Sequence, residues 1–161
     1  MKHILKNREV PNSMKRKVFN ACILPVMTYG IETVTLTKKS ANKLRITQRA
    51  MERTMLGISI RDRIRNEVIR SITKIEDIIK VAASSKWRWA GHVARESSDK
   101  WTKILLCWRP RTSARSAGRP QLRWRDDIVQ SAGTTWMQKA QDRTEWKRME
   151  EAYIQQWMAT G

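Results

Sequence analysis

Residues 86–95 read KWRWAGHVAR, a stretch that sets two tryptophans one residue apart beside one of only two histidines in the chain. An enzymatic site, a nucleic-acid surface and a helix with a mixed face would each use such residues. A helix explains the whole stretch, because apolar residues before and within it recur at helical spacing. They form one stripe of Ile75, Ile78, Ile79, Ala82, Trp89 and Val93. On this phase we expect Trp89 in the core and Trp87 pointing away from it. A third face carries a basic ridge, formed by Arg88, His92 and Arg95.

Helical spacing recurs along the rest of the chain. We expect helices over residues 12–24, 40–57, 62–72, 73–95, 99–108, 122–133 and 143–158. Cap and stop residues mark their ends, namely Asn12 or Ser13, Ser40, Asp62, a Thr73–Glu76 capping box and Asp99 at the starts, and Pro25, Gly57 and Gly133 at the stops. The segment VMTYGIETVTL at 26–36 is β-prone and predicts a short extended crossing. The predicted fold class is therefore all-α, with connectors.

Apolar residues three or four positions apart mark the buried face of each predicted helix. Apart from the stripe described above, the expected core residues are Met14, Val18, Cys22, Leu44, Met51, Met55, Ile64, Val68, Ile72, Trp101, Ile104, Leu105, Trp108, Trp146, Met149, Tyr153 and Trp157.

The charge of the chain is strongly basic. Its 161 residues carry 33 Lys and Arg against 15 Asp and Glu, a formal net charge of +18. Such a balance favours polyanions, above all nucleic-acid backbones, as partners. No stretch approaches the roughly 20 apolar residues of a membrane-spanning helix, so we expect no membrane partner. The N-terminal residues do not form a signal peptide, and Cys22 and Cys107 belong to no CxxC pair, which indicates a reduced, intracellular protein.

Tryptophan is unevenly distributed along the chain. None of the eight tryptophans precedes residue 87. This shift predicts a boundary near residue 85, between a helical region at 1–85 and a basic, Trp-rich region at 86–161. The Pro, Arg, Ser and Gly residues near 109–120 predict a flexible loop in the second region.

The basic residues concentrate in residues 86–125, where eleven Lys or Arg oppose only Glu96 and Asp99, and five tryptophans lie among them. Cations neutralise phosphates, and an exposed indole stacks on unpaired bases. The predicted nucleic-acid-binding residues are Lys86, Trp87, Arg88, His92, Arg95, Arg109, Arg111, Arg115, Arg119, Arg123 and Arg125. The alternative interpretation is a solvated basic face over helices with Trp-rich cores.

Neither a catalytic nor a metal site is predicted. His92 has no metal-ligating residue at suitable spacing on its helix face, which favours a polar contact. Residues 124–127, WRDD, superficially fit the aromatic-x-Asp-Asp signature of polymerase metal sites. The local pattern there is helical, however, and we expect Asp126 and Asp127 to favour a helix N-terminus and to pair with Arg123 or Arg125. No cofactor is expected in this chain.

Six segments together resemble a known family. They are LPVMTYGIETVTLT (24–37), QRAMERTMLGISIRDRIRNEVI (48–69), KWRWAGHVAR (86–95), WTKILLCWRPR (101–111), GRPQLRWRDDI (118–128) and WMQKAQDRTEWKRMEEAYIQQW (136–157). In this order they resemble the endonuclease–reverse transcriptases of non-LTR (LINE-type) retrotransposons of the RTE/BovB-like kind. The distinctive elements are R-W-x-G-H-x-x-R and A-Q-D-R-x-x-W. One departure is Val34, where relatives commonly carry Trp, and another is Ile31, where they often carry Cys or Ser.

The resemblance implies that residues 1–85 are the thumb of the polymerase and that the remainder is its C-terminal extension. The fingers, and the palm with its magnesium-binding aspartates, would lie upstream of Met1, so we expect this chain to be inactive by itself. RNA and DNA, together with other parts of the polymerase, are the implied partners, and the implied location is the nucleus.

Two hypotheses follow from the sequence. In the first, the chain is a non-catalytic part of a retrotransposon polymerase that binds template–primer or element RNA. In the second, it is a free-standing or co-opted helical module that binds nucleic acid or a protein partner. An independent enzyme is the least favoured reading, because no convergent set of titratable groups is evident.

Overall fold

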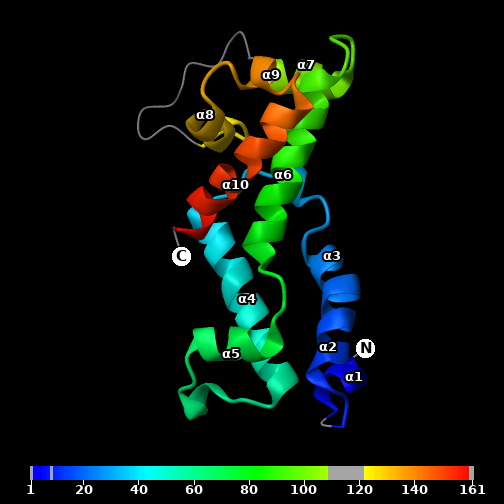
Figure 1. Cartoon of the computed structure of the whole chain (residues 1–161), viewed down its shortest axis with the longest axis vertical. Helices are drawn as coiled ribbons and strands as arrows, with labels where there is room; N and C mark the ends of the chain where they lie inside the picture. The colour runs from blue at the N-terminus through cyan, green and yellow to red at the C-terminus, as the bar shows by residue number, and fades with distance from the viewer. Residues whose placement is uncertain (1, 8, 109–121, 160–161) are drawn as a thin grey trace. The chain divides into compact units, whose positions relative to one another are not determined.

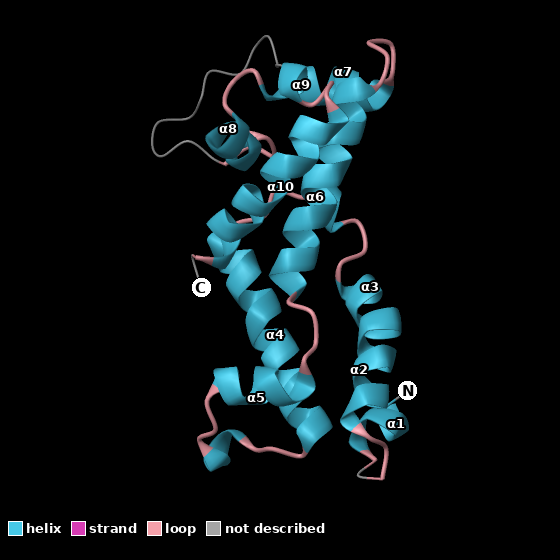
Figure 2. Cartoon of the chain, viewed as in Figure 1, coloured by secondary structure: helices cyan, strands magenta, loops and turns pink. Residues whose placement is uncertain are grey.

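The computed structural model describes residues 2–7, 9–108 and 122–159. Every regular element in these ranges is helical (Figure 2), which confirms the predicted all-α fold. The chain divides into two compact units, and neither is continuous in sequence. Unit 1 comprises Met1–Tyr29 and Lys38–Val81, and unit 2 comprises Gly30–Thr37 and Ala82–Gly161. The helix α6, Ile78–Arg95, contributes its first residues to unit 1 and the rest to unit 2.

In its described residues, unit 1 contains five further α-helices, which Figure 1 labels along the first half of the chain. They are α1 (Lys2–Lys6), α2 (Asn12–Val18), α4 (Lys38–Leu56) and α5 (Asn66–Thr73), with the short α3 (Leu24–Met27) after a π-helical turn at Phe19–Ile23. Helix α4 packs against α1 and α5, and α2 packs against α5. Gly57, with φ of 70°, follows the end of α4 as predicted.

Pro25 does not end the first predicted helix. Pro25 lies inside α3, directly after the π-helical turn, in which the Leu24 N–H donates to the Phe19 carbonyl five residues earlier. In a regular α-helix the proline ring clashes with the carbonyl four residues before it. A wider turn separates these groups, so the chain continues as a helix. The predicted extended crossing is correspondingly short. Ile31–Thr33 form a 3-10 turn, and Val34 is extended.

The predicted buried face of residues 12–24 is wrong. Met14 is 50% exposed and Cys22 is exposed, whereas Lys15, Phe19 and Leu24 are buried. The Lys15 ammonium donates to the Met55 carbonyl at 3.1 Å, near the C-terminus of α4. A lysine is normally assigned to the surface. The pattern of apolar residues alone therefore assigns the wrong side of this helix to the core.

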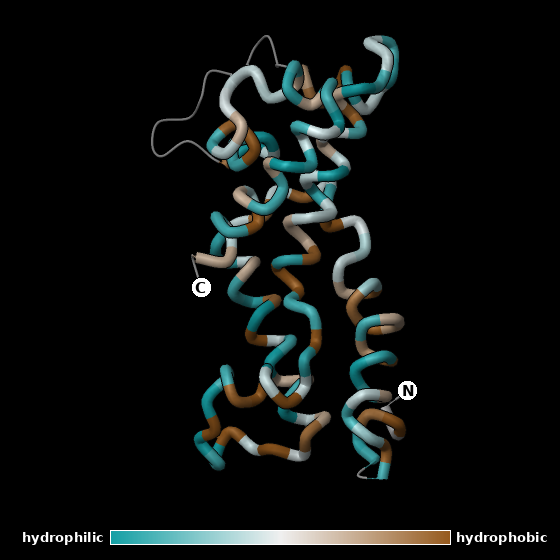
Figure 3. Tube along the Cα trace, in the orientation of Figure 1, coloured by the Kyte–Doolittle hydropathy of each residue, from teal (hydrophilic) through white to brown (hydrophobic). Residues whose placement is uncertain are grey.

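The core of unit 1 is partly polar. Helix α4 interleaves hydrophilic and hydrophobic residues (Figure 3), and its buried residues are Ala41, Gln48, Arg49, Glu52 and Met55. The Arg49 guanidinium pairs with Glu52 and lies 3.0 Å from Asp77, and the Thr73 hydroxyl donates to Glu52 at 3.3 Å. These contacts satisfy the charged groups that burial would otherwise penalise.

The predicted helix N-caps are wrong. Asn12 and Ser13 lie inside α2, whose N-cap is Pro11, and Ser40 lies inside α4, which begins at Lys38. The N-cap of α7 (Trp101–Cys107) is Lys100 and not Asp99.

Thr73 ends α5 instead of opening α6, and the N-terminus of α6 is capped by Asp77, whose carboxylate accepts the Ile79 N–H at 2.9 Å. Asp62 closes a 3-10 turn through a capping box with Ser59, and α5 starts only at Asn66.

Several predicted core positions around α5 are also displaced. Val68 and Ile72 are 47% and 44% exposed, because α5 buries Ile69 and Thr73 instead.

Unit 2 is built around α10, Arg143–Met158, which has the predicted bounds. Its predicted core residues Trp146, Tyr153 and Trp157 are buried, and Met149 is half-buried. The other helices of this unit are the C-terminal part of α6, α7 (Trp101–Cys107), α8 (Asp126–Ala132) and α9 (Trp136–Lys139). Helix α10 packs against α8, and α8 against α9. Gly133 follows α8 with φ of 84°, as the predicted stop.

Helix α7 does not bury its apolar stripe. Trp101, Leu105 and Trp108 are 75%, 66% and 66% exposed, and Ile104 is 38% exposed. The prediction that these residues lie in the core is therefore wrong. Helical spacing shows that a segment has an apolar face, whereas burial of that face also requires an apolar partner elsewhere in the chain.

Candidate functional site

The structure reverses the predicted positions of the two tryptophans of α6: the buried face of the helix contains Trp87, not Trp89. Trp87 is 1% exposed, together with the buried residues Lys86, Ala90 and Ala94, whereas Trp89 is only half-buried. The predictions that Trp87 points outward and that Trp89 is fully in the core are therefore wrong. The buried face of α6 is formed largely by small alanines, which leave room for large side chains from other helices.

Trp87 and Trp146 join α6 to α10. Their rings stack with 3.9 Å between centroids and 6° between planes. The Trp87 indole N–H donates to the Trp146 carbonyl at 2.9 Å, and the Trp146 indole N–H donates to the Trp87 carbonyl at 3.0 Å. Both polar groups of the buried indoles are thereby satisfied.

Gly91 permits this close contact between the helices. A Cβ atom at this position would lie 2.4 Å from Trp146 Nε1 and 2.6 Å from Trp146 Cδ1, far inside van der Waals contact. Gly91 lies one helical turn after Trp87, so the glycine and the stacked indole occupy the same face of α6. The glycine of the KWRWAGHVAR stretch is therefore explained by packing.

A buried polar cluster lies next to Trp87, whose ring contacts Tyr153 with 4.8 Å between centroids. The Lys86 ammonium lies 2.9 and 2.8 Å from the two carboxylate oxygens of Asp127, and the Tyr153 hydroxyl donates to Asp127 at 2.8 Å. Burial lowers the pKa of Lys86, which Asp127 partly opposes, and burial together with the Asp127 charge raises the pKa of Tyr153 far above its ordinary range. Lys86 is 2% exposed and Asp127 5% exposed, so both are inaccessible to a ligand.

The two aspartates at the start of α8 have different roles. Both lie in its first turn, as predicted. Their predicted ion pairs with Arg123 or Arg125 are not found among the described residues, since Asp127 pairs with Lys86 and Asp126 accepts the Arg123 backbone N–H at 2.7 Å.

A groove of about 540 Å³ runs along the solvent side of the α6–α10 contact. Trp87 and Trp146 lie at its base. Its other lining residues are Arg88, His92 and Arg95 from α6, and Arg143, Lys147 and Glu150 from α10. The two sets have the same spacing, i, i+4 and i+7, so each helix presents one face to the groove. Five of these six residues are basic, counting His92.

The charges of the groove are unevenly paired. Arg88 Nε lies 3.0 Å from Glu150 Oε1, and His92 Nε2 lies 3.5 Å from Glu96 Oε1. Arg95 donates to the Ala140 carbonyl at 2.6 Å, and burial, together with the nearby Arg143 charge, lowers the pKa of Arg95. With the described residues, Arg95, Arg143 and Lys147 form no ion pair.

The structure brings together only part of the predicted binding residues. Arg88, His92 and Arg95 line one groove, as their spacing suggested, whereas Lys86 and Trp87 are buried. Arg123 is exposed and Arg125 half-buried just before α8, outside the groove lining. Arg109, Arg111, Arg115 and Arg119 lie outside the described residues.

Sequence reasoning missed the contribution of α10, namely Arg143, Lys147 and Glu150. The available signal was their i, i+4, i+7 spacing, which repeats the spacing of the basic ridge on α6.

Trp124 has a structural role near this cluster. Its indole N–H donates to the Glu32 carbonyl at 2.7 Å, which ties segment 30–37 into unit 2. Trp89 meets the Trp124 ring edge-on with 5.0 Å between centroids, and the Lys86 ammonium lies 4.9 Å from the Trp124 centroid.

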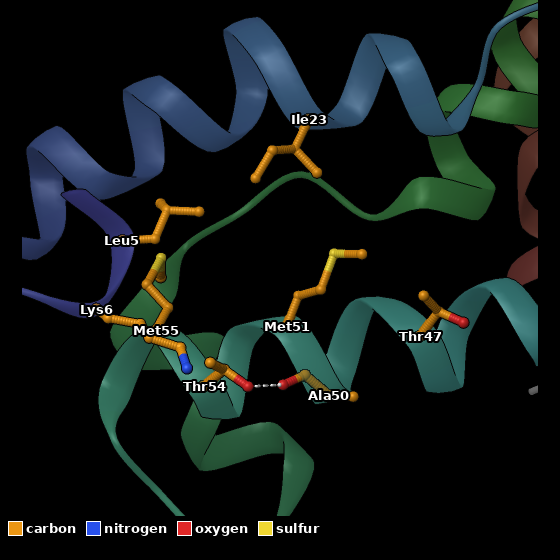
Figure 4. A pocket seen from close by; sticks show the side chains of 8 residues that line it. All are labelled: Leu5, Lys6, Ile23, Thr47, Ala50, Met51, Thr54 and Met55. Atoms are coloured by element: carbon orange, nitrogen blue, oxygen red, sulfur yellow. Dashed lines mark hydrogen bonds between the residues drawn. The ribbon is translucent and has the colours of Figure 1, made fainter. Parts of the chain in front are cut away.

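A second pocket, of about 480 Å³, lies in unit 1 (Figure 4). Its lining is Leu5, Lys6, Ile23, Thr47, Ala50, Met51, Thr54 and Met55. The hydroxyl of Thr54 is occupied by the Ala50 carbonyl, to which it donates at 2.9 Å. With Lys6 as its one ionisable lining residue, this pocket offers no pair of groups for acid–base chemistry.

Two further features are absent from the described ranges, namely a cluster of metal-ligating side chains and a membrane-spanning helix. Residues 2–7, 9–108 and 122–159 contain no group of three or more His, Cys, Asp or Glu side chains placed to hold a metal ion. Likewise, none of the helices in these ranges has both the length and the apolar character needed to cross a bilayer.

The chain is similar to an uncharacterized transposon-derived protein of Caenorhabditis elegans. The two are 34% identical over 142 aligned positions, and the match covers 80% of this chain and 51% of the relative. The chain thus spans about half the length of the curated relative it matches. This similarity supports an origin in a transposable element. No family model and no solved structure matches the chain.

Proposed function

We propose that the chain binds the phosphate backbone of nucleic acid through the groove between α6 and α10. The observation that carries this proposal is the convergence of Arg88, His92, Arg95, Arg143 and Lys147 on one groove. Phosphate contacts supply most of the sequence-independent affinity for nucleic acid, and clustered cations are their usual source. The net charge of +18 supports the same partner, because it raises the local concentration of polyanions.

The proposed biological setting is the polymerase of a non-LTR retrotransposon of the RTE/BovB-like kind. The similarity to a transposon-derived protein supports the transposable-element part of this proposal. The resemblance of the six quoted segments to endonuclease–reverse transcriptases supports the finer part. In this setting the chain acts as thumb and C-terminal extension, holds template–primer or element RNA, and works in the nucleus. Magnesium chemistry belongs to the palm of that polymerase.

The test is a salt titration of binding to labelled duplex DNA and to an RNA–DNA hybrid. If about six phosphates are contacted, the log–log slope of affinity against salt on duplex DNA is expected near −5. Arg143→Ala and Lys147→Ala should each make this slope shallower by about one unit. The matched control is Arg148→Ala, which removes an exposed cation from the same helix outside the groove lining. An affinity that is independent of salt, or an equal loss from Arg148→Ala, would reject the proposal.

A second candidate function is docking to a protein, and the exposed apolar face of α7 favours it. In the retrotransposon setting the partner would be another part of the polymerase. Leu105→Glu places a charge on this face and should abolish such docking while leaving oligonucleotide binding intact. If the same change instead weakens oligonucleotide binding, the α7 face belongs to the nucleic-acid surface.

A further inference from the structure

The two ends of the groove differ in how their cations are neutralised. At one end, Arg88 is paired with Glu150 at 3.0 Å. At the other end, Arg95 and Arg143 have no carboxylate partner among the described residues, and neither has Lys147, which lies between Arg143 and Glu150 on the α10 face. This asymmetry restricts where an anionic ligand can bind.

We propose that Glu150 is a specificity-determining residue: its carboxylate takes the place of a phosphate at Arg88, and a phosphodiester of a nucleic-acid backbone binds at the open end, between Arg95, Arg143 and Lys147. This inference rests on the proposed function of the groove and adds to it the position of the phosphate and the residue that limits its extent.

Glu150 is held firmly in its position. Its side chain is 15% exposed, and one carboxylate oxygen, Oε1, accepts hydrogen bonds from both Arg88 Nε and the Ser84 hydroxyl. Charge-assisted hydrogen bonds of this kind are stronger than those between neutral groups. The Arg88 side chain, by contrast, is 74% exposed, so its charge is accessible to a ligand once the carboxylate is neutralised.

The open end is prepared for an anion. Arg95 is anchored by the Ala140 carbonyl, so its guanidinium does not need to be ordered when a ligand binds. Arg95 and Arg143 line the same groove, and burial together with the Arg143 charge lowers the pKa of Arg95, so the two like charges repel each other. A phosphate between them would relieve this repulsion.

The base of the groove excludes stacking as the mode of recognition. Trp87 and Trp146 are 1% and 4% exposed and cover each other's ring faces, so neither offers a face to a base. Single-strand binders of the stacking type require such a free face. The groove therefore binds the sugar–phosphate backbone and should not distinguish one base sequence from another.

The experiment compares Glu150→Gln with Glu151→Gln in the salt titration on duplex DNA. Both variants remove one negative charge from α10, but only Glu150 lines the groove. In Glu150→Gln, Arg88 becomes available for one more phosphate, so the log–log slope should steepen by about 0.9. Affinity at low salt should rise by about two- to fivefold, the value of one exposed ion pair. Glu151→Gln should leave the slope unchanged.

The double variant Arg88→Ala/Glu150→Gln provides the second measurement, because it removes both partners and leaves no unpaired charge. It should return the slope to that of the unmodified chain. If Glu150→Gln and Glu151→Gln behave alike while Arg143→Ala and Lys147→Ala still weaken binding, the inference about Glu150 is wrong and the proposed function stands. If Arg143→Ala, Lys147→Ala and Glu150→Gln all leave binding unchanged, the proposed function is wrong as well. If the affinity depends on the base composition of the oligonucleotide, and does so equally in the unmodified chain and in Glu150→Gln, this result would count for stacking and against the inference.

Discussion

Trp87 and Trp146 each donate an indole N–H to the backbone carbonyl of the other while their rings stack 3.9 Å apart. The contact is reciprocal, and because each acceptor is a backbone carbonyl, removing either side chain eliminates the stack and the hydrogen bond that this side chain donates. Tyr153 packs against Trp87 with 4.8 Å between ring centroids, and Trp136 lies 6.0 Å from Trp146. The groove described above depends on this aromatic cluster, because the cluster sets the separation of α6 and α10.

Replacement of Trp87 should be far more damaging than replacement of Trp89. Trp87→Ala removes a fully buried indole and should cost about 3–5 kcal/mol of unfolding free energy. Trp89 is half-buried and contacts Trp124 edge-on, so Trp89→Ala should cost distinctly less. Urea denaturation of the two variants measures the difference. A larger loss of unfolding free energy for Trp89→Ala than for Trp87→Ala would contradict the assignment of Trp87 to the buried face of α6.

Gly91→Ala should destabilise the chain, although the same change in an ordinary helix interior stabilises by about 1 kcal/mol. The new Cβ would collide with Trp146, and relieving such overpacking typically costs about 1–3 kcal/mol. The sign of the change, read from thermal or urea unfolding, is therefore diagnostic. Combining Gly91→Ala with Trp146→Ala should cost less than the sum of the two single losses, because the indole atoms that collide with the new Cβ are then absent. Additive losses in the double variant would argue against this collision.

Asp127→Asn and Asp126→Asn form a matched pair, since both neutralise one carboxylate in the first turn of α8. Asp127→Asn leaves the buried Lys86 ammonium without its ion pair and should cost about 3–5 kcal/mol. Asp126 is exposed and accepts one backbone N–H, so its replacement should cost no more than about 1 kcal/mol. Equal effects in urea denaturation would mean that the Lys86–Asp127 pair contributes nothing specific.

Tyr153 should make the chain sensitive to alkaline pH. Its pKa is raised in the folded state, so above about pH 10 the unfolded chain loses a proton that the folded chain retains. Stability must then fall as pH rises through that range, by up to about 1.4 kcal/mol per pH unit. Lys86, whose pKa is lowered, acts in the opposite direction at pH values between its folded pKa and about 10.4, because there the unfolded chain binds more protons.

The corresponding measurement is the unfolding free energy of Tyr153→Phe against that of the unmodified chain from neutral to strongly alkaline pH. Above pH 10 the variant should lose stability less steeply. At neutral pH it should be less stable by about 1.5–3 kcal/mol, because a hydrogen bond to the charged Asp127 is lost. Tyr29→Phe alters the other tyrosine of the chain, which is 91% exposed, and should leave neutral stability unchanged.

Elements whose cores are apolar could be predicted from the sequence. Helix α10 has the predicted bounds because Trp146, Tyr153 and Trp157 mark its buried face without a charged exception. The phase of α6 was predicted wrongly because Lys86 occupies a core position. Its partner Asp127 lies 41 residues further along the chain, and no local pattern reveals a pairing of that range.

The same reasoning applies to the groove. The basic ridge on α6 was visible as Arg88, His92 and Arg95, since three charges at helical spacing define a face without knowledge of the partner. The α10 face became evident only once the Trp87–Trp146 contact showed which side of that helix meets α6. The apolar face of α7 shows the opposite error. Its helical spacing predicted burial, but no other described part of the chain covers it.

The hydrogen bond from the Trp124 indole N–H to the Glu32 carbonyl has a consequence for biosynthesis. Glu32 precedes Trp124 by 92 residues, so the ribosome releases one partner long before it makes the other. Both parts of unit 1 have been synthesised by Val81, and unit 1 can form while translation continues. Residues 30–37, in contrast, must wait until the C-terminal half has emerged. A nascent chain arrested before residue 124 should therefore present this segment to proteases and chaperones. Deletion of the first half of the gene would remove residues 30–37, which belong to unit 2.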